Sequence, residues 1–383
     1  MTYLTEERLL IQKSAREFAM KEVLPAANEL DRVKGDIPMS IRDQMGQLGY
    51  FGMRIPERYG GLELGVFEYI LVTEELARAW MSVASIIARG NGLGGGFSDE
   101  QKERYLPRMA RGEFLGAMAL SEAEAGSDLA NVQCRARRDG DDWVINGSKM
   151  WCTFADGADY IQVLCRTEDA DPAARHRGTA MFFFEKERGT FPPGLQATMI
   201  NKIGYHGWRT WELHFDDFRL PATARLGDEQ REGFKSAVGF LESARAHTAA
   251  RATGLARGAL EDSIAYAGQR VQFGQPIGKF QAIRFKIAEM AAEIEAARQL
   301  TYFCCDAIDS GRRCDREAAM AKWFASEMAE RVTSQALQIH GGVGYTTDLP
   351  IERYWRDARL TKIFEGTSEI QLRIISDRLM GDR

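Results

Sequence analysis

Segments with the composition of β-strands gather in the middle of this 383-residue chain, between two parts with helical periodicity. Residues 159–167 and 178–186 have strand length and strand-type side chains, and residues 210–218 alternate apolar with polar side chains. The pair Asn146-Gly147, between two apolar segments, predicts a hairpin. Because no helical period separates these segments, we expect an antiparallel sheet domain and not a βαβ sheet.

The part before the strands is predicted to be helical. A first helix lies within residues 6–24, with an apolar face formed by Leu10, Ala15, Phe18 and Ala19. Residues 69–88 predict one longer, more apolar helix. Ser98 is a candidate N-cap for a third helix, with Pro107 as a later break.

Helical periodicity returns from about residue 230. Apolar residues recur at steps of three and four between Ile283 and Cys304, and residues 316–339 form a second helical segment. Such continuous apolar stripes suit packing in a bundle. We therefore expect an α+β protein with a helical domain over 1–115, a β domain over 116–225 and a helical bundle over 226–383.

Bulk properties exclude several classes of function. The net charge of −5 offers no basic field for nucleic acid, and no apolar run approaches the ~20 residues of a membrane helix. The six cysteines form no C-x-x-C pair and the five histidines no H-E-x-x-H motif, so we expect no metal site. The first residues lack the features of a signal sequence, which favours a cytoplasmic protein.

A glycine-rich stretch raises the question of a dinucleotide site. Gly90, Gly92 and Gly95 fit the spacing G-x-G-x-x-G, which binds a pyrophosphate when it joins a strand to a helix. Here a helical segment precedes the glycines and no βαβ unit follows. The pattern therefore favours the end of a helix running into a turn.

Several polar and aromatic residues could carry chemistry. Trp151 would be an aromatic plate beside the hydroxyl of Thr153, an arrangement that suits a planar heteroaromatic cofactor, although a core Trp is the commoner use. Arg270 could pair with phosphate. Glu365 is a carboxylate among apolar neighbours and a candidate base, or else an ordinary solvated loop residue.

Five segments, in order, resemble the acyl-CoA dehydrogenase family over essentially the whole chain. They are LSEAEAGSD (120–128), KMWCT (149–153), RVQFGQPIGKFQ (270–281), QIHGGVGY (338–345) and IFEGTSEIQ (363–371). The resemblance implies an N-terminal helical domain, a central β domain and a C-terminal four-helix bundle. It also implies non-covalent FAD, a homotetramer built as a dimer of dimers, and an electron-transfer flavoprotein as acceptor.

The resemblance further implies two groups of FAD-binding residues. The flavin half would contact Met118, Leu120, Ser121, Gly126, Ser127, Trp151, Cys152 and Thr153. The ADP half would be held from a neighbouring subunit by Arg270, Phe273, Gln281, Gln338, Gly341 and Gly342, with Thr367 and Glu369 completing the pocket.

By the same resemblance, Glu365 would remove the α-proton of an acyl-CoA thioester while the β-hydride passes to flavin N5. The position that holds the base in some members is Ala244 here, which leaves Glu365 as the candidate. Ser127, Glu242, Arg245 and Gly366 match substrate-contact positions, although Asp is commoner at 242. Alternative functions on this fold are an oxidase, a decarboxylating or desulfinating enzyme, and a non-catalytic flavin-binding protein.

Arg89 departs from what an acyl pocket would need, because it falls near the far end of an acyl chain. A buried cation needs an anionic partner or water. One hypothesis is that Arg89 binds a substrate carboxylate; the alternative is that it leaves the helix end and pairs with Glu100 or solvent. Glutaryl-CoA dehydrogenases carry an arginine one turn earlier, where this chain has Ala84. The acyl group stays open among branched, aromatic and carboxylated types.

Overall fold

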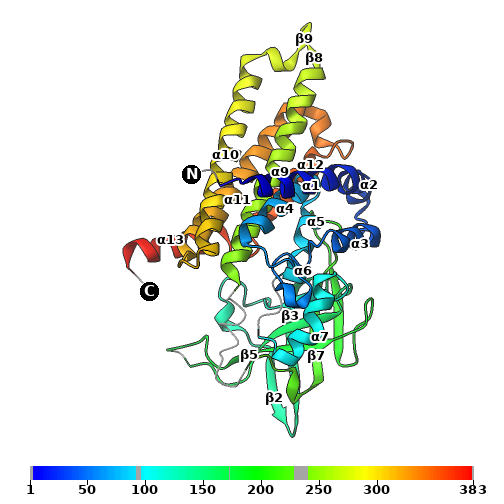
Figure 1. Ribbon diagram of the computed structural model, residues 1–383, viewed down its shortest axis with the longest axis vertical. Helices are drawn as coiled ribbons and strands as arrows, with labels where there is room; N and C mark the ends of the chain where they lie inside the picture. The colour runs from blue at the N-terminus through cyan, green and yellow to red at the C-terminus, as the bar shows by residue number, and fades with distance from the viewer. Residues whose placement is uncertain (1–2, 92–95, 172, 228–239, 382–383) are drawn as a thin grey trace.

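The computed structural model describes residues 3–91, 96–171, 173–227 and 240–381. Figure 1 shows the N-terminal helices against one side of a long helical bundle, with the β part at the lower end of the molecule. The predictions made for Gly92 and Gly95 concern residues outside the described ranges. No helix in the described ranges is both long enough and apolar enough to cross a membrane.

The first part is helical, as predicted, but its details differ. Leu10 is 67% exposed whereas Ala15, Phe18 and Ala19 are buried, because a residue five positions away points to a different side of the helix. The expected helix over 69–88 is interrupted at Trp80, whose extended backbone separates α4 from α5. Ser98 caps α7 as predicted, but α7 continues through Pro107. The helices are α1 (Glu6–Phe18), α2 (Leu24–Leu30), α3 (Met39–Gln47), α4 (Val66–Ala79), α5 (Met81–Ile86), α6 (Ala88–Asn91) and α7 (Asp99–Ala110).

The middle part is one seven-stranded sheet in which most neighbours are antiparallel. The strand β4 provides the exceptions, since it pairs in parallel with β1 and, through Arg135 and Arg166, with β2. The strands are β1 (Gly116–Ala119), β2 (Arg135–Asp139), β3 (Asp142–Thr153), β4 (Tyr160–Arg166), β5 (Thr179–Glu185), β6 (Leu195–Ile200) and β7 (Thr210–Pro221).

The hairpin predicted at Asn146-Gly147 is wrong, because this pair lies inside β3. The register between β3 and β7 shifts between Ile145 and Gly147, so the pair forms a bulge. Gly147 has φ +130°, and a Cβ there would lie 2.8 Å from the Cα of Cys134. The turn that joins β2 to β3 instead contains Gly140, with φ +63°.

The last part is a bundle of long helices. The central helix α9 (Leu241–Gln269) packs against α4, α10 (Gln281–Asp309) and α11 (Asp315–His340). A short hairpin, β8 (Val271–Gln272) with β9 (Gln275–Pro276), joins α9 to α10 at the far end of the bundle (Figure 1). The helices α12 (Ile351–Thr361) and α13 (Ser368–Met380) complete the chain's helical end.

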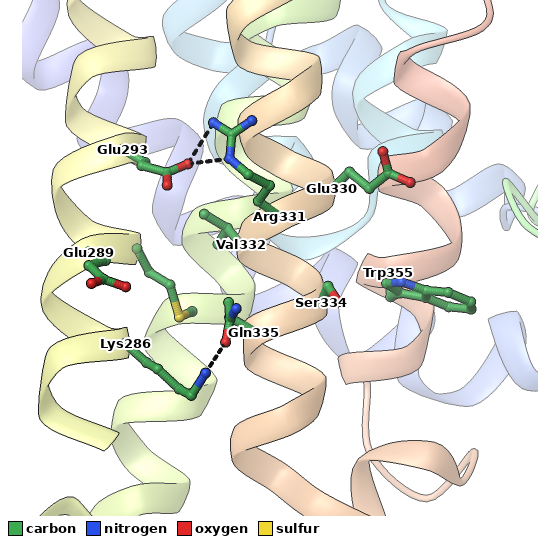
Figure 2. Close-up of a pocket in the computed structure, with 10 residues that line it drawn as sticks. Lys286, Glu289, Glu293, Glu330, Arg331, Val332, Ser334, Gln335 and Trp355 are labelled. Atoms are coloured by element: carbon green, nitrogen blue, oxygen red, sulfur yellow. Dashed lines mark hydrogen bonds and ion pairs between the residues drawn. The ribbon is translucent and has the colours of Figure 1, made fainter. Parts of the chain in front are cut away.

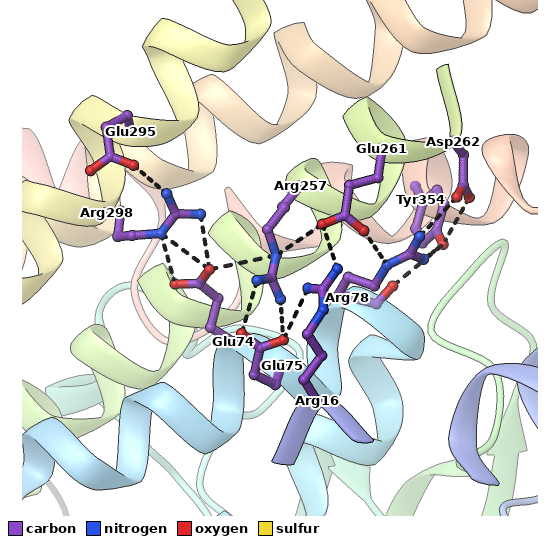
Figure 3. A network of polar contacts seen from close by, with 10 residues as sticks. All are labelled: Arg16, Glu74, Glu75, Arg78, Arg257, Glu261, Asp262, Glu295, Arg298 and Tyr354. Carbon is purple, nitrogen blue, oxygen red and sulfur yellow. Dashed lines mark hydrogen bonds and ion pairs between the residues drawn. The ribbon is translucent and has the colours of Figure 1, made fainter. Parts of the chain in front are cut away.

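An ionic network joins the N-terminal helices to the bundle (Figure 3). Glu74 and Glu75 of α4 are buried, and Arg257 of α9 lies between them and donates to both oxygens of Glu75. Arg298 of α10 donates to Glu74, and Arg16 of α1 contacts Glu75. Because each buried carboxylate has a guanidinium partner, the network sets α4 in one position across the bundle.

Candidate active site

Glu365 lies in the turn between α12 and α13, in a backbone conformation that side chains seldom adopt. Its φ is +54° and that of Gly366 is +90°. Two side chains stabilise the turn by donating hydrogen bonds to the carbonyl of Gly366: Lys322 Nζ at 2.7 Å and Gln371 Nε2 at 2.9 Å. Burial lowers the pKa of Lys322 to about 8. The turn therefore presents the Glu365 carboxylate from a fixed backbone.

A cavity beside this carboxylate collects residues from all three parts of the chain. The first part contributes Arg54, Tyr69 and Arg89, β1 contributes Met118, and α9 contributes Ala244, His247 and Arg251. The structure thus brings the predicted residues Glu365, Met118 and Arg89 to one cavity. Ala244 lines it without offering a carboxylate, and Glu365 is the only acidic residue among the described residues of the lining.

Sequence reasoning missed Arg251, which forms an ion pair with Glu365. Its Nη2 lies 2.8 Å from each oxygen of the Glu365 carboxylate. The hydroxyl of Thr248 hydrogen-bonds to the same carboxylate, and Arg251 Nη1 donates to Ser85 Oγ at 2.8 Å. Burial opposes the charge of Arg251, but the neighbouring Glu365 reverses this and raises the arginine's pKa. A signal was present, because Arg251 interrupts a run of small residues on a helix.

His247 adds no charge to the cavity. Its Nε2 donates to the carbonyl of Ala84 at 3.0 Å, which fixes the tautomer. Burial, and then the nearby Arg251, lower the pKa of His247 well below its usual value. The ring is therefore neutral at physiological pH.

Arg89 lies in α6, half-buried, and the structure shows no ion pair from it to Glu100 or to any other described residue. Gly90 beside it is buried where a Cβ would meet the carbonyl oxygen of Phe51 at 2.4 Å. The part of the glycine stretch that the structure describes is therefore the end of a short helix packed against a loop.

The residues predicted for the flavin half lie on the sheet. Trp151 is 57% exposed, has φ +63° and sits at a second register shift of β3, between Lys149 and Cys152. Cys152 is buried, whereas the Thr153 hydroxyl lies 3.1 Å from that of Thr210. An aromatic plate exposed on a sheet beside two hydroxyls fits an isoalloxazine ring.

The loop after β1 is anchored by a buried ion pair. Lys149 Nζ lies 2.7 Å from Glu122 Oε1, and the same carboxylate accepts from the backbone of Gln133 and Cys134. Leu120 and Ser121 precede this anchor and are half-buried, whereas Gly126 and Ser127 after it are exposed. No neighbour lies within 4 Å of a Cβ built on Gly126, which leaves room for a ligand.

The residues predicted for the ADP half lie elsewhere. Arg270, Gly341 and Gly342 line a separate cavity near the β8–β9 hairpin, and Phe273 in that hairpin is 93% exposed. Figure 1 places this hairpin at the opposite end of the bundle from β3. Gln281 and Gln338 are exposed at the same end. One chain therefore does not bring both predicted halves together, and the contribution of a neighbouring subunit stays a prediction.

The remaining predicted residues lie directly after the Glu365 turn and at the start of α9. Thr367 is the N-cap of α13, and Glu369 is exposed in its first turn. Glu242 is half-buried at the start of α9, and Arg245 one turn later is buried. Its Nε has no hydrogen-bond partner among the described residues, which leaves a donor for a ligand.

Another cavity, between α10, α11 and α12, has a different character (Figure 2). Two contacts cross its lining: Arg331 pairs with Glu293 at 2.8 Å, and Lys286 donates to the side-chain oxygen of Gln335. None of the predicted site residues lines it. The cavity beside Glu365 is therefore the better candidate for catalysis.

Comparison with known proteins identifies the family of the chain. The family descriptions "Acyl-CoA dehydrogenase" N-terminal, middle and C-terminal domain match residues 5–113, 117–218 and 231–380. The chain is 41% identical over 389 residues to (2S)-methylsuccinyl-CoA dehydrogenase of Cereibacter sphaeroides, covering 98% of this chain and 70% of that protein. It is 39% identical to an acyl-CoA dehydrogenase of Bacillus subtilis (strain 168), covering 99% of each.

A solved structure shows the same fold. Butyryl-CoA dehydrogenase from Megasphaera elsdenii superposes with a TM-score of 0.91 at 36% identity, covering 98% of this chain and 99% of that one. The matches to all three domain descriptions and to full-length relatives point to the same family. The chain belongs to the acyl-CoA dehydrogenase family, whose members are FAD-dependent oxidoreductases acting on acyl-CoA.

Proposed function

We propose that the protein converts an acyl-CoA thioester to the trans-2-enoyl-CoA, with Glu365 removing the α-proton. The observation that carries this proposal is the single carboxylate in the described lining of the cavity, at a strained turn and beside Met118 of β1. Bound FAD supplies the acceptor for the β-hydride. Trp151, Thr153 and the loop around Ser121 would hold its flavin half.

The protein's own contribution is to place the base and to stabilise negative charge. A thioester carbonyl acidifies the neighbouring α-proton, and donors aimed at the carbonyl oxygen lower the barrier further. The backbone N–H of Glu365 is a candidate donor, because the same turn that presents the carboxylate also presents this group. Lys322 and Gln371 hold the turn and so keep base and donor in a fixed relation.

Two observations favour a carboxylated acyl group over branched or aromatic ones. Arg89 and Arg54 line the cavity, and neither guanidinium has an anionic partner among the described residues. The relative from Cereibacter sphaeroides is named for methylsuccinyl-CoA, a carboxylated thioester. We also propose an electron-transfer flavoprotein as acceptor and a homotetramer in which a neighbouring subunit binds the ADP half of FAD.

An anaerobic titration of the flavin absorbance tests the reaction. Short, branched, aromatic and dicarboxylic thioesters are added in turn to the purified flavoprotein. We expect at least one class of thioester to bleach the flavin. In Glu365→Gln, the rate of bleaching should fall by about 10³-fold or more, with the flavin content unchanged. A flavin that no thioester bleaches, or full activity in Glu365→Gln, contradicts the proposal.

A further inference from the structure

Arg251 occupies an unusual position for a residue beside a catalytic base. The residue is 1% exposed, and its guanidinium lies over the ring of Phe364, 4.6 Å from the centroid. Both oxygens of Glu365 are within 2.8 Å of Nη2, so in the free protein the base is held by a full positive charge. The Nε group has no hydrogen-bond partner among the described residues, although it is buried. Arg251 therefore retains capacity for another acceptor.

The cavity carries more positive than negative charge. Three guanidinium groups, those of Arg54, Arg89 and Arg251, line it together with one carboxylate, and His247 is neutral. Guanidinium groups withdrawn from water are stabilised by a carboxylate, which they bind through two parallel hydrogen bonds. The described lining offers one such group for three cations. The charge balance therefore favours a ligand that brings a second carboxylate into the cavity.

Distance limits where this second carboxylate can be on the ligand. A general base must come within roughly 3.2 Å of the atom that loses its proton. Because Nη2 is 2.8 Å from both base oxygens, it must lie within roughly 6 Å of the substrate's α-carbon. A carboxylate attached to the β- or γ-carbon falls within this reach. The terminal carboxylate of a long dicarboxylic chain does not.

We propose that Arg251 selects short dicarboxylic thioesters by exchanging one carboxylate for another. In the free protein it pairs with Glu365. When a succinyl-type substrate binds, its carboxylate takes over part of the bonding of Arg251, and Glu365, no longer fully paired, accepts the α-proton from the same position. A neutral acyl group offers no such acceptor, so the base stays held by Arg251 and reacts slowly. This inference rests on the proposed function.

Succinyl-CoA and butyryl-CoA form a matched pair, because they differ only in a carboxylate in place of the terminal methyl. We would measure binding of both by calorimetry in Glu365→Gln, where no turnover occurs, with and without Arg251→Gln. We expect Arg251→Gln to weaken succinyl-CoA binding by about 10- to 100-fold and to change butyryl-CoA binding by less than about twofold. Equal weakening of both ligands overturns the inference.

Turnover gives a second, independent readout. With Glu365 present, we expect the wild type to bleach faster with methylsuccinyl-CoA or succinyl-CoA than with butyryl-CoA, and Arg251→Gln to reverse this preference by raising the butyryl-CoA rate. Arg251→Lys should retain part of the preference, because it keeps the charge. A wild type that oxidises butyryl-CoA at least as well as the dicarboxylic thioesters overturns the inference but leaves the proposed dehydrogenation intact.

The matched control is Arg353→Gln. Arg353 is also buried, at 3% exposure, but it contacts Asn28 and the carbonyl of Ala79 and does not line the cavity. This variant should leave the ratio of the two affinities unchanged. Flavin content identifies any variant that fails to fold. If Arg251→Gln fails to fold, the substrate preference of the wild type and the binding measurements on Arg251→Lys still decide the inference.

Discussion

Lys322 offers a way to separate the placement of the proposed base, Glu365, from the stability of the fold. Its side chain is fully buried on α11, and Nζ donates to the carbonyl of Gly366, directly after Glu365. We predict that Lys322→Met lowers the rate of flavin reduction by about 100-fold, because a shift of the base by ~1 Å has an effect of that size. Lys322 acts here as a positioning residue.

The effect on stability should be small, since two contributions oppose each other. Loss of a hydrogen bond from a charged donor costs roughly 1.5–3 kcal/mol. Burial lowers the pKa of Lys322 from 10.5 to about 8, so removing the cation relieves about 3 kcal/mol at neutral pH. The two nearly cancel. The melting temperature of the variant should therefore stay within about 5 °C of the wild type.

The pH dependence provides the sharper assay. Between about pH 8 and 10.5 the unfolded chain binds a proton at Lys322 that the folded chain does not, so this residue makes stability rise with pH in that window. Activity should change in the opposite sense, because Lys322 loses its charge above about pH 8. The measurement is the single-turnover rate of flavin reduction between pH 6 and 10, with chemical unfolding at the same pH values.

In Lys322→Met, both the fall in rate near pH 8 and this share of the stability slope should disappear. Comparing the two proteins at each pH cancels the other groups that titrate there, such as Lys202, whose pKa burial also lowers to about 8. A variant with a single-turnover rate within about threefold of the wild type, or with an unchanged pH profile, would refute the reasoning.

The remaining predictions concern charged groups in other parts of the fold. Arg89→Met should weaken binding of a dicarboxylic thioester by about tenfold and leave butyryl-CoA binding unchanged, as measured by calorimetry. If the ratio of the activities on the two thioesters is the same in the variant and the wild type, Arg89 has no role in carboxylate binding. Glu75→Ala leaves Arg257 without its strongest partner, so the free energy of unfolding in urea should fall by about 3–5 kcal/mol, against less than about 1 kcal/mol for the half-exposed Glu295→Gln. Burial and the neighbouring Asp31 raise the pKa of Asp357 from 3.8 to about 6, so the contribution of this residue to stability is full below pH 3.8 and is lost as pH rises through 6. Asp357→Asn should flatten this pH dependence and have a larger free energy of unfolding than the wild type at pH 7. A smaller free energy of unfolding there would show that the carboxylate is needed.

Most of the architecture follows from local patterns. The helical periods of α10 and α11 and the strand segments β4, β5 and β7 are where residue spacing predicts them, because each pattern reports which side of an element faces the core. Two local predictions were wrong, at positions where one residue pattern is compatible with two backbone arrangements. Trp80 breaks a helix that periodicity would continue, and Asn146-Gly147 forms a bulge where turn preferences predict a hairpin.

The family, its cofactor and the candidate base could also be predicted from the sequence, because the five motifs are contiguous segments that occur in order along the chain. The surroundings of the base could not. Arg251 is 114 residues from Glu365 in the chain, and only the packing of α9 beneath the turn brings their side chains to 2.8 Å. Spacing along a chain carries no information about such a contact, since the distance depends on how the helices pack. The sequence by itself determined the class of chemistry, whereas the tertiary structure decided which charges surround the candidate base, because those contacts depend on how distant helices pack.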